Sequence, residues 1–247
     1  MTLILIIIIG FCTTFIGTLT GGGGLIGMPS MLLVGLPIHS VIATAKFSNV
    51  FSSFSSFYVL LKQRELTMKE VRKLIPVPLI GGISGGLLAN SFSDTTMNLI
   101  AVFLLSFAFI LNFVKKPSAS EGSHWKLNKK IFPALYGISV YDGMFGPGQG
   151  TLLMYTFLHT GASYVKALAL TRFQTFISCF AAFTSYFFAG HFMWEQALCY
   201  TAGGILGAQL AVRLAKRISP AYLKMLLHAV TLLLILQILY RLISGQI

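Results

Sequence analysis

Long apolar stretches alternate with short polar or glycine-rich segments along the whole chain. Five stretches lie in the first half, near residues 2–19, 24–36, 39–61, 74–92 and 95–114. Five more lie in the second half, near residues 131–145, 148–161, 163–189, 191–212 and 220–243. A helix needs about 20 predominantly apolar residues to cross a bilayer, and most of these stretches approach that length with few internal charges. The pattern therefore predicts an all-α polytopic membrane protein.

The second stretch of each half is too short to span a bilayer. Residues 24–36 would form a helix about 20 Å long at 1.5 Å per residue, whereas the hydrocarbon core is about 30 Å thick. We expect half-helices or re-entrant elements at these two places. The sequence leaves open whether eight or ten segments cross completely.

A glycine-rich break precedes each short stretch. Gly21-Gly22-Gly23-Gly24 comes before the first, with Pro29 shortly after it, and Gly146-Pro147-Gly148-Gln149-Gly150 comes before the second. Glycine costs about 1 kcal/mol relative to alanine inside a helix. Broken backbone at membrane depth is tolerated where it packs in protein or lines a wet cavity. A break repeated in both halves is typical of a transport site.

Composition and charge agree with a membrane protein. The chain is 55% hydrophobic and 10% charged, which excludes an ordinary soluble globule. Its net charge of +12 comes mainly from three basic clusters, within residues 62–73, 115–130 and 213–224. Basic residues gathered in loops follow the positive-inside rule, so we expect these loops on the inner side of the cytoplasmic membrane. The same distribution argues against a nucleic-acid partner.

The two halves of the chain are related in sequence. A shift of 126 residues aligns Lys46 with Arg172 and Ser52 with Ser178. The loop after the third stretch is basic in the first half, whereas the equivalent loop near His191 has no Lys or Arg. Equivalent loops on opposite sides of the membrane are the mark of inverted-topology repeats. We therefore predict two inverted repeats, residues 1–114 and 131–247, joined by a basic cytoplasmic linker at 115–130.

Two cations lie at matching depths in the third stretch of each half. Lys46 and Arg172 stand about 10–14 Å along their helices, and a cation so placed usually faces a partner or a watery cavity. Polar neighbours and the free N–H groups at the start of each short helix would complete a site for a small anion. The predicted binding residues are Lys46, Arg172, Thr44, Asn49, Thr171, Gln174, Gly22, Gly23, Gly24, Gly148, Gln149 and Gly150. The alternative is that both cations snorkel to the interface or pair with a structural carboxylate.

Asp142 is one of six acidic residues and lies in an apolar stretch. Because desolvation favours the neutral form of a carboxyl group, Asp142 is the candidate for proton coupling. The sequence leaves two other roles open, namely neutralising Arg172 and capping a helix.

No pattern of residues predicts a metal or a cofactor. Cys12, Cys179 and Cys199 lie in apolar stretches without CxxC spacing, which is typical of small buried hydrophobic residues. The glycine runs lack the Lys-Ser/Thr ending of a P-loop, which argues against ATP-driven pumping by this chain.

Two alternative functions remain at this stage. Gly82-Ile83-Ser84-Gly85 matches the GxSG of rhomboid-type intramembrane serine proteases, and His228 in a later apolar stretch could act as the base. Close helix packing through small residues explains the same four residues. An anion channel is the second alternative, because it shares the apolar pattern of a carrier.

The glycine-rich motifs and the residues after them resemble the paired signatures of the TauE/SafE sulfite-exporter family. The segments of this chain that resemble the first signature are Gly21–Pro29, Gly35-Leu36-Pro37 and Ala43-Thr44-Ala45-Lys46. Those that resemble the second are Gly146–Gly150, Gly161 and Ala169-Leu170-Thr171-Arg172. The resemblance implies a permease for small anions, typically sulfite, organosulfur compounds or related carboxylates. We therefore expect a secondary transporter, not an enzyme, which is coupled to protons and works by alternating access. Its partners would be the anion, protons and membrane lipids, and a homo-oligomer is left open.

Overall fold

A computed structural model describes residues 2–20, 23–64, 66–111 and 129–214, together with positions 232 and 236. Most of the predicted linker at 115–130 lies outside these ranges, as do nearly all of the stretch predicted at 220–243 and the predicted site residue Gly22.

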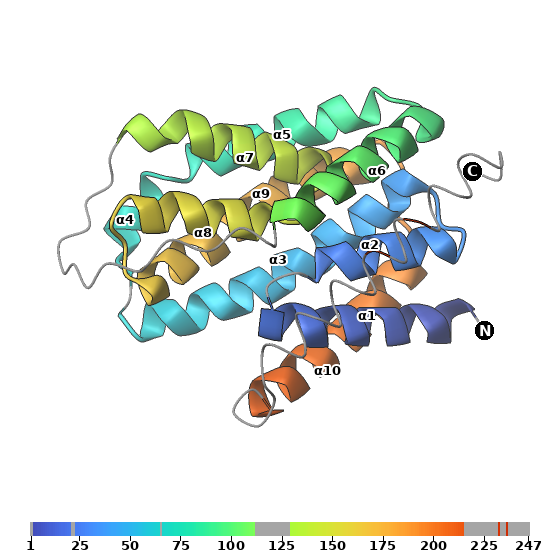
Figure 1. Ribbon diagram of the computed structural model, residues 1–247, viewed down its shortest axis with the longest axis horizontal. Coiled ribbons are helices and arrows are strands. Elements are labelled where there is room, and N and C mark those ends of the chain that lie inside the picture. Colours follow the sequence, from blue (N-terminus) through green and yellow to red (C-terminus); the bar gives the residue numbers. More distant parts are fainter. Residues whose placement is uncertain are drawn as a thin grey trace.

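Helices make up all the regular structure in the described ranges, as the apolar pattern predicts (Figure 1). They are α1 (Thr2–Thr20), α2 (Gly24–Leu33), α3 (Ile38–Lys62), α4 (Met68–Arg72), α5 (Pro76–Asn90), α6 (Asp94–Leu111), a 3-10 turn η1 (Lys129–Ile131), α7 (Phe132–Met144), α8 (Gln149–His159), α9 (Tyr164–Phe188) and α10 (Trp194–Leu214).

Glycine and proline set several helix ends. Pro76 and Pro133 stand in the first turns of α5 and α7, where a missing N–H costs nothing. Gly35 and Gly161 follow the short helices α2 and α8 with φ of +92° and +85°, which are left-handed values that glycine adopts easily. Both short helices therefore end in the same way. The two glycines are 126 residues apart, which is the shift that aligns the two halves of the sequence.

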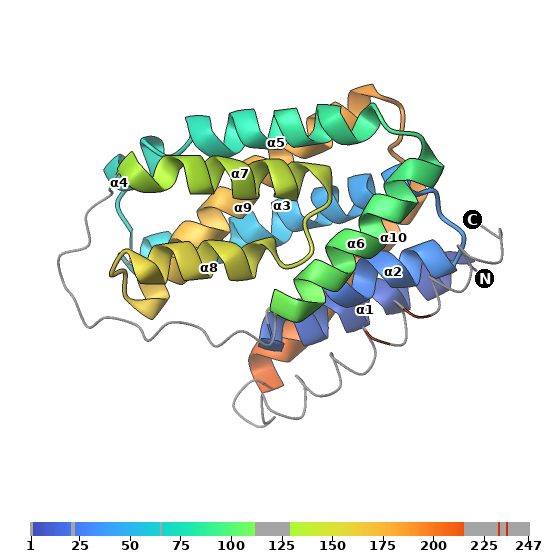
Figure 2. The ribbon, with the colours of Figure 1, turned by 45° about the horizontal axis from the view of Figure 1, so that its top comes forward.

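The two longest helices, α3 and α9, pack against each other in the middle of the bundle. The ring of Phe47 is tilted against that of Phe183 with centroids 5.3 Å apart, and the ring of Phe57 is tilted against that of Phe173 at 5.0 Å. Because residue numbers rise along one helix as they fall along the other, the two helices run antiparallel. Helices α5 and α7 lie on one side of this pair, with α1 and α10 on the other (Figure 2).

Glycines line the contacts between the outer helix pairs. A Cβ atom on Gly85 of α5 would lie 2.1 Å from the carbonyl oxygen of Val140 in α7. A Cβ atom on Gly203 of α10 would lie 2.0 Å from the carbonyl oxygen of Ile7 in α1. Only glycine allows the backbones to approach this closely, as in many membrane helix pairs.

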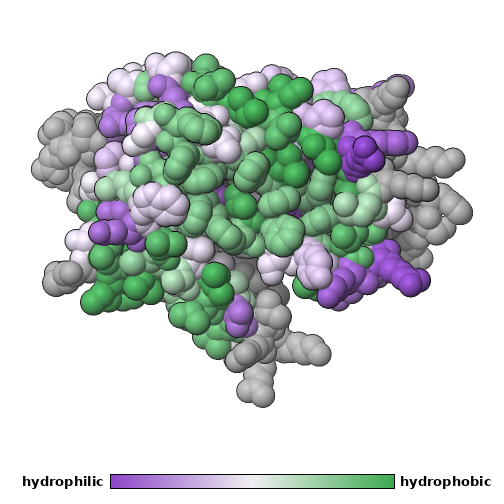
Figure 3. Space-filling model, turned by 180° about the vertical axis from the view of Figure 1, so that it is seen from behind, coloured by the Kyte–Doolittle hydropathy of each residue, from purple (hydrophilic) through white to green (hydrophobic). Residues whose placement is uncertain are grey.

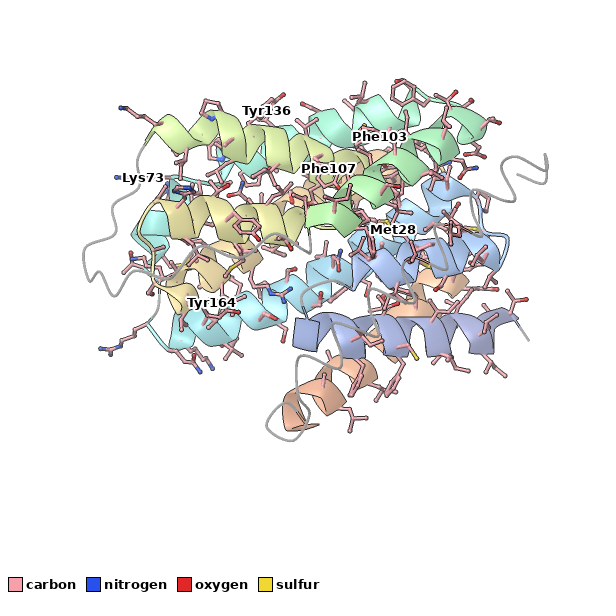
Figure 4. The ribbon with its side chains drawn as sticks, viewed as in Figure 1. Met28, Lys73, Phe103, Phe107, Tyr136 and Tyr164 are labelled. Carbon is pink, nitrogen blue, oxygen red and sulfur yellow. The ribbon has the colours of Figure 1, made fainter. Side chains whose placement is uncertain are left out.

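The outer surface is strongly apolar. Phe103 of α6 and Phe188 of α9 are 72% and 85% exposed, and Figure 4 shows Phe103 and Phe107 on α6. Large apolar areas also cover the opposite face (Figure 3). Within the described residues, α6 and α9 are each long and apolar enough to cross a membrane. Such a surface suits lipid, because a soluble protein rarely exposes so many large apolar side chains.

Candidate functional site

A buried ion pair joins α3 to α7 in the interior. The Nζ atom of Lys46 lies 2.8 Å from Oδ1 of Asp142, and the two side chains are 1% and 2% exposed. Among the roles left open for Asp142, the structure pairs it with Lys46 and not with Arg172. Since Asp142 stands in the last turn of α7, near the negative end of the helix dipole, Lys46 also offsets an unfavourable position for a carboxylate.

The second oxygen of Asp142 is held by α9. The hydroxyl of Ser178 donates a hydrogen bond to Oδ2, and the Cys179 thiol lies 3.5 Å from the same atom. Ser178 Oγ also lies 3.4 Å from the carbonyl oxygen of Thr175. Ser178 is absent from the predicted site residues, although its alignment with Ser52 was a signal available in the sequence. A buried carboxylate is costly unless it is paired and hydrogen-bonded, and here both conditions are met.

Gly146 passes directly beside the ion pair. Its φ is +107°, and a Cβ atom there would lie 2.5 Å from Lys46 Nζ and 2.8 Å from Asp142 Oδ1. Glycine is therefore required for two reasons, the backbone conformation and the space that the charged groups occupy.

The two glycine-rich breaks, far apart in sequence, meet in space. Helix α2 begins at Gly24, where a Cβ atom would lie 3.3 Å from Cα of Pro147 in the second break. Gly148 has φ of +83° and precedes the first residue of α8. The hydroxyl of Tyr141 donates to the carbonyl oxygen of Pro147 and ties the second break to α7. Both short helices thus begin close to the Lys46–Asp142 pair.

The remaining predicted glycines differ in their surroundings. A Cβ atom on Gly23 would lie 2.8 Å from the carbonyl oxygen of Thr13, so Gly23 packs against α1. A Cβ atom on Gly150 would meet nothing within 4 Å.

Several buried polar atoms near these elements have no hydrogen-bond partner in the described part of the chain. They are the hydroxyls of Thr44 and Thr171 and the side-chain oxygens of Gln149 and Gln174. Buried polar groups are nearly always paired in native proteins. Unpaired ones mark places where water or a polar ligand fits.

The amide nitrogens of the two glutamines are already used. Gln149 donates to Thr175 Oγ1 at 2.8 Å, while Gln174 donates to Ser139 Oγ at 3.2 Å and to a backbone carbonyl of α7. Both predicted side chains therefore tie α9 to its neighbours and leave an acceptor oxygen free for a proton-bearing group.

Arg172 has different surroundings from Lys46. It is half-buried on α9, and the phenol of Tyr164 at the start of that helix lies within electrostatic range. Neither ion pair between described residues includes Arg172. Asn49 is exposed and lies near the Cys179 thiol. Lys46 is therefore buried against Asp142, whereas Arg172 lies outside that pair and nearer the phenol of Tyr164.

A second polar cluster lies where α3 begins. His39 Nδ1 is 2.5 Å from Asp94 Oδ1, and Nε2 is 3.0 Å from the carbonyl oxygen of Ala89. The ring of His191 stacks on His39 with centroids 4.6 Å apart. Burial, and then the positive charge of His39, lower the pKa of His191, while Asp94 opposes this shift. The residues of this cluster come from α3, α6 and the loop before α10, so no local sequence pattern predicted it.

A surface hollow lies between α5 and α9, away from the ion pair. It has a volume of about 430 Å³ and is lined by Ile83, Leu87, Asn90, Thr184, Ser185, Phe188 and Ala189. Most of this lining is apolar and exposed, so the hollow belongs to the lipid-facing surface.

Comparison with known proteins identifies the family. The sequence profile of the sulfite exporter TauE/SafE family matches residues 6–238. The chain belongs to the TauE/SafE family. This confirms the resemblance of the two glycine-rich signatures, and it makes the protein a multi-pass membrane protein of a transporter family rather than an enzyme.

Curated relatives of the TauE/SafE protein have matching descriptions. It is 32% identical over 233 residues to a probable membrane transporter protein, ORF9, of Sinorhizobium sp., covering 93% of this chain and 89% of that one. It is 28% identical to a probable membrane transporter protein of Haemophilus influenzae, covering 83% and 82%. It is 23% identical to the probable membrane transporter protein YfcA of Escherichia coli K12, covering 81% and 76%. No solved structure matches the chain.

Membership of a transporter family excludes the serine-protease alternative. The Tyr136 hydroxyl donates a hydrogen bond to Ser84 Oγ at 3.4 Å. The proposed base, His228, lies outside the described residues. Gly82 and Gly85 instead serve helix packing, because Cβ atoms on them would collide with backbone oxygens of α9 and α7.

Proposed function

We propose that this TauE/SafE protein is a secondary transporter that moves a small anion, such as sulfite, an organosulfonate or a related small carboxylate, across the cytoplasmic membrane. The observation that carries the proposal is the buried Lys46–Asp142 pair beside the two helix breaks. A lysine so deep in an apolar bundle is costly unless it has a function or a partner. An anion that replaces the carboxylate at Lys46 would find a charge already desolvated and oriented.

The anion site proposed here consists of Lys46, the backbone of both breaks and nearby donors. The unpaired hydroxyls of Thr44 and Thr171 are suited to donate to an anion. The start of α8 and that of α2 add positive dipole ends. Arg172 would attract the anion from the side of the bundle on which Tyr164 lies, with Asn49 and Gln174 as further polar contacts.

Asp142 is the proposed proton-coupling residue. It is buried, in contact with Lys46, and held by Ser178. Because Asp142 neutralises Lys46, the proposed anion-binding cation, binding of an anion at Lys46 and binding of a proton at Asp142 would depend on each other.

Two inverted repeats, residues 1–114 and 131–247, would supply the alternating access. The packing of α3 on α9 supports this part of the proposal. A shift of 126 residues, with the two helices exchanged, converts the contact Phe47–Phe183 into Phe173–Phe57, and both pairs are in contact with the same 52° angle between their rings. The pairing of α1 with α10 corresponds in the same way to that of α7 with α5. Rocking of related halves around a fixed site is a common route to transport.

Flux through purified protein in liposomes tests the proposal. Sulfite, sulfate, thiosulfate, an alkanesulfonate and a short carboxylate would be offered with and without a pH gradient. We expect saturable, pH-gradient-dependent flux of at least one anion, with large losses in Lys46→Ala and Arg172→Ala. Lys62→Ala is the matched control, because Lys62 is exposed and contacts the ring of Tyr58. Unchanged uptake in both site variants would overturn the site, and high conductance along the electrochemical gradient would favour an anion channel.

A further inference from the structure

The Lys46–Asp142 pair is electrically neutral when both groups are charged. Burying a net charge in an apolar interior is far more costly than burying a matched pair. An anion that binds Lys46 adds one negative charge to this site. Neutrality returns when Asp142 takes up one proton, so that Lys46 is balanced by the anion and Asp142 is a neutral carboxylic acid.

The partners of Asp142 differ in whether they tolerate this change. Lys46 is a donor and cannot accept a hydrogen bond, and the Cys179 thiol is a weak donor 3.5 Å away. The Ser178 hydroxyl has one hydrogen and two lone pairs, so it can donate or accept. Its oxygen contacts Asp142 Oδ2 and lies 3.4 Å from the carbonyl oxygen of Thr175.

These two contacts satisfy both protonation states of Asp142. With the carboxylate charged, Ser178 donates its hydrogen to Oδ2. When a proton from water binds Oδ2, the new O–H group donates to Ser178 Oγ, and the Ser178 hydrogen turns to the Thr175 carbonyl. The proton leaves to water by the reverse rotation. Apart from the entering or leaving proton, only a hydroxyl hydrogen moves.

We propose that Ser178 is the positioning residue for proton exchange at Asp142 and that each transport cycle uses one proton per monovalent anion. The proposal rests on the transport function proposed above. It adds a role for Ser178, which is absent from the predicted site residues, and it adds a ratio of protons to anions.

The register between the halves explains why a single proton is expected. Ser52 is the counterpart of Ser178, and its hydroxyl makes the equivalent bond, 3.4 Å from the carbonyl oxygen of Asn49. The counterpart of Asp142, however, is Ile16, which cannot bind a proton. One half of the bundle therefore has a serine with a carboxylate partner, and the other half has the serine without it.

This difference provides a matched pair of variants, Ser178→Ala and Ser52→Ala. Anion flux and proton uptake would be measured in proteoliposomes between pH 5 and 9. The Ser178 hydroxyl donates a hydrogen bond to the charged carboxylate of Asp142. Removing this hydroxyl therefore makes protonation of Asp142 easier. The pH of half-maximal flux should rise by about one unit in Ser178→Ala. Ser52→Ala should keep the wild-type profile, and Ser178→Thr should restore it.

The count of protons supplies the second readout. We expect one proton per monovalent anion in the wild-type protein, and pH-independent flux without proton movement in Asp142→Asn. If Ser178→Ala does not fold, Ser178→Cys should move the profile in the same direction by less, because a thiol is a weaker donor. Normal flux with an unchanged pH profile in Ser178→Ala and Ser178→Cys, or equal shifts in Ser52→Ala and Ser178→Ala, would overturn this inference alone. Absence of flux in the wild-type protein would overturn the proposed function and this inference with it.

Discussion

Lys46 illustrates how one residue can be predicted to matter while its partner stays unknown. Its depth in an apolar stretch predicts a buried or snorkelling cation. The structure places it against Asp142, 96 positions later in the chain and in the other half. Arg172, which a shift of 126 residues aligns with Lys46, belongs to neither ion pair between described residues and lies near the phenol of Tyr164. The two cations are equivalent in sequence but not in surroundings.

Breaking the buried pair should be costly for stability. Lys46→Ala leaves an uncompensated carboxylate and should lower the free energy of unfolding by about 3–5 kcal/mol. The double variant Lys46→Met with Asp142→Asn should recover much of this loss, because no unpaired charge remains. Thermal unfolding in detergent measures both, with Lys62→Ala expected to change stability by less than about 0.5 kcal/mol. Equal losses in the single and double variants would show that the charges are not coupled.

His191 should make stability depend on pH. Burial first, and then His39, lower its pKa in the folded state, so the folded protein binds fewer protons than the unfolded chain below the ordinary histidine pKa of about 6.5. Stability should therefore fall as the pH drops through that value. Between pH 7.5 and 5.5, the melting temperature of His191→Asn should fall by less than that of the wild-type protein. Ser91→Ala, which alters a nearby exposed loop without removing a titrating group, should retain the wild-type dependence.

At the scale of the elements, the breaks between helices position the charged groups. Helix α7 ends at Met144 and α8 begins at Gln149, and the intervening backbone turns at Gly146 and Gly148. The equivalent break before α2 packs against Pro147. Two short helices can begin beside the ion pair only because helical structure is interrupted at these breaks.

Gly146→Ala should be much more harmful than the same change at Gly161. Both glycines have positive φ, so each variant carries backbone strain of about 1–3 kcal/mol. A Cβ atom on Gly146 would also displace Lys46 Nζ, whereas one on Gly161 meets nothing within 4 Å. Thermal unfolding and anion flux of the two variants give the comparison. If both lose the same stability and retain flux, the backbone at Gly146 does not constrain the pair.

At the scale of the whole molecule, α3 and α9 separate two pairs of helices joined along glycine seams. The loops at Gln63 and Ser91 lie at opposite ends of the bundle. Basic residues gather near Gln63 and are lacking near Ser91. The positive-inside rule therefore predicts that the first loop lies in the cytoplasm.

Cysteine labelling tests this orientation. In a chain whose native cysteines are replaced by alanine, Gln63→Cys should react with an impermeant maleimide in inverted vesicles and stay unlabelled in right-side-out vesicles. Ser91→Cys should show the reverse. Both residues are exposed, so accessibility within the protein does not limit the reaction. Labelling of both positions from one side would contradict the predicted topology.

The sequence by itself determined the properties that depend on neighbouring residues. Apolar length, glycine breaks and basic loops indicated a helical membrane transporter, because lipid requires long apolar helices and translocation retains positive loops inside. The depth of Lys46 and Arg172 along their helices was predicted from the same count of residues.

Only the tertiary structure decided which distant residues meet. It paired Lys46 with Asp142 and brought Ser178 to the same carboxylate. It joined His39 to Asp94 and His191, and it placed Gly24 beside Pro147. These contacts depend on how helices cross and turn about their axes. No local pattern encodes that rotation, since a helix with little amphipathic character can present any face to its neighbour.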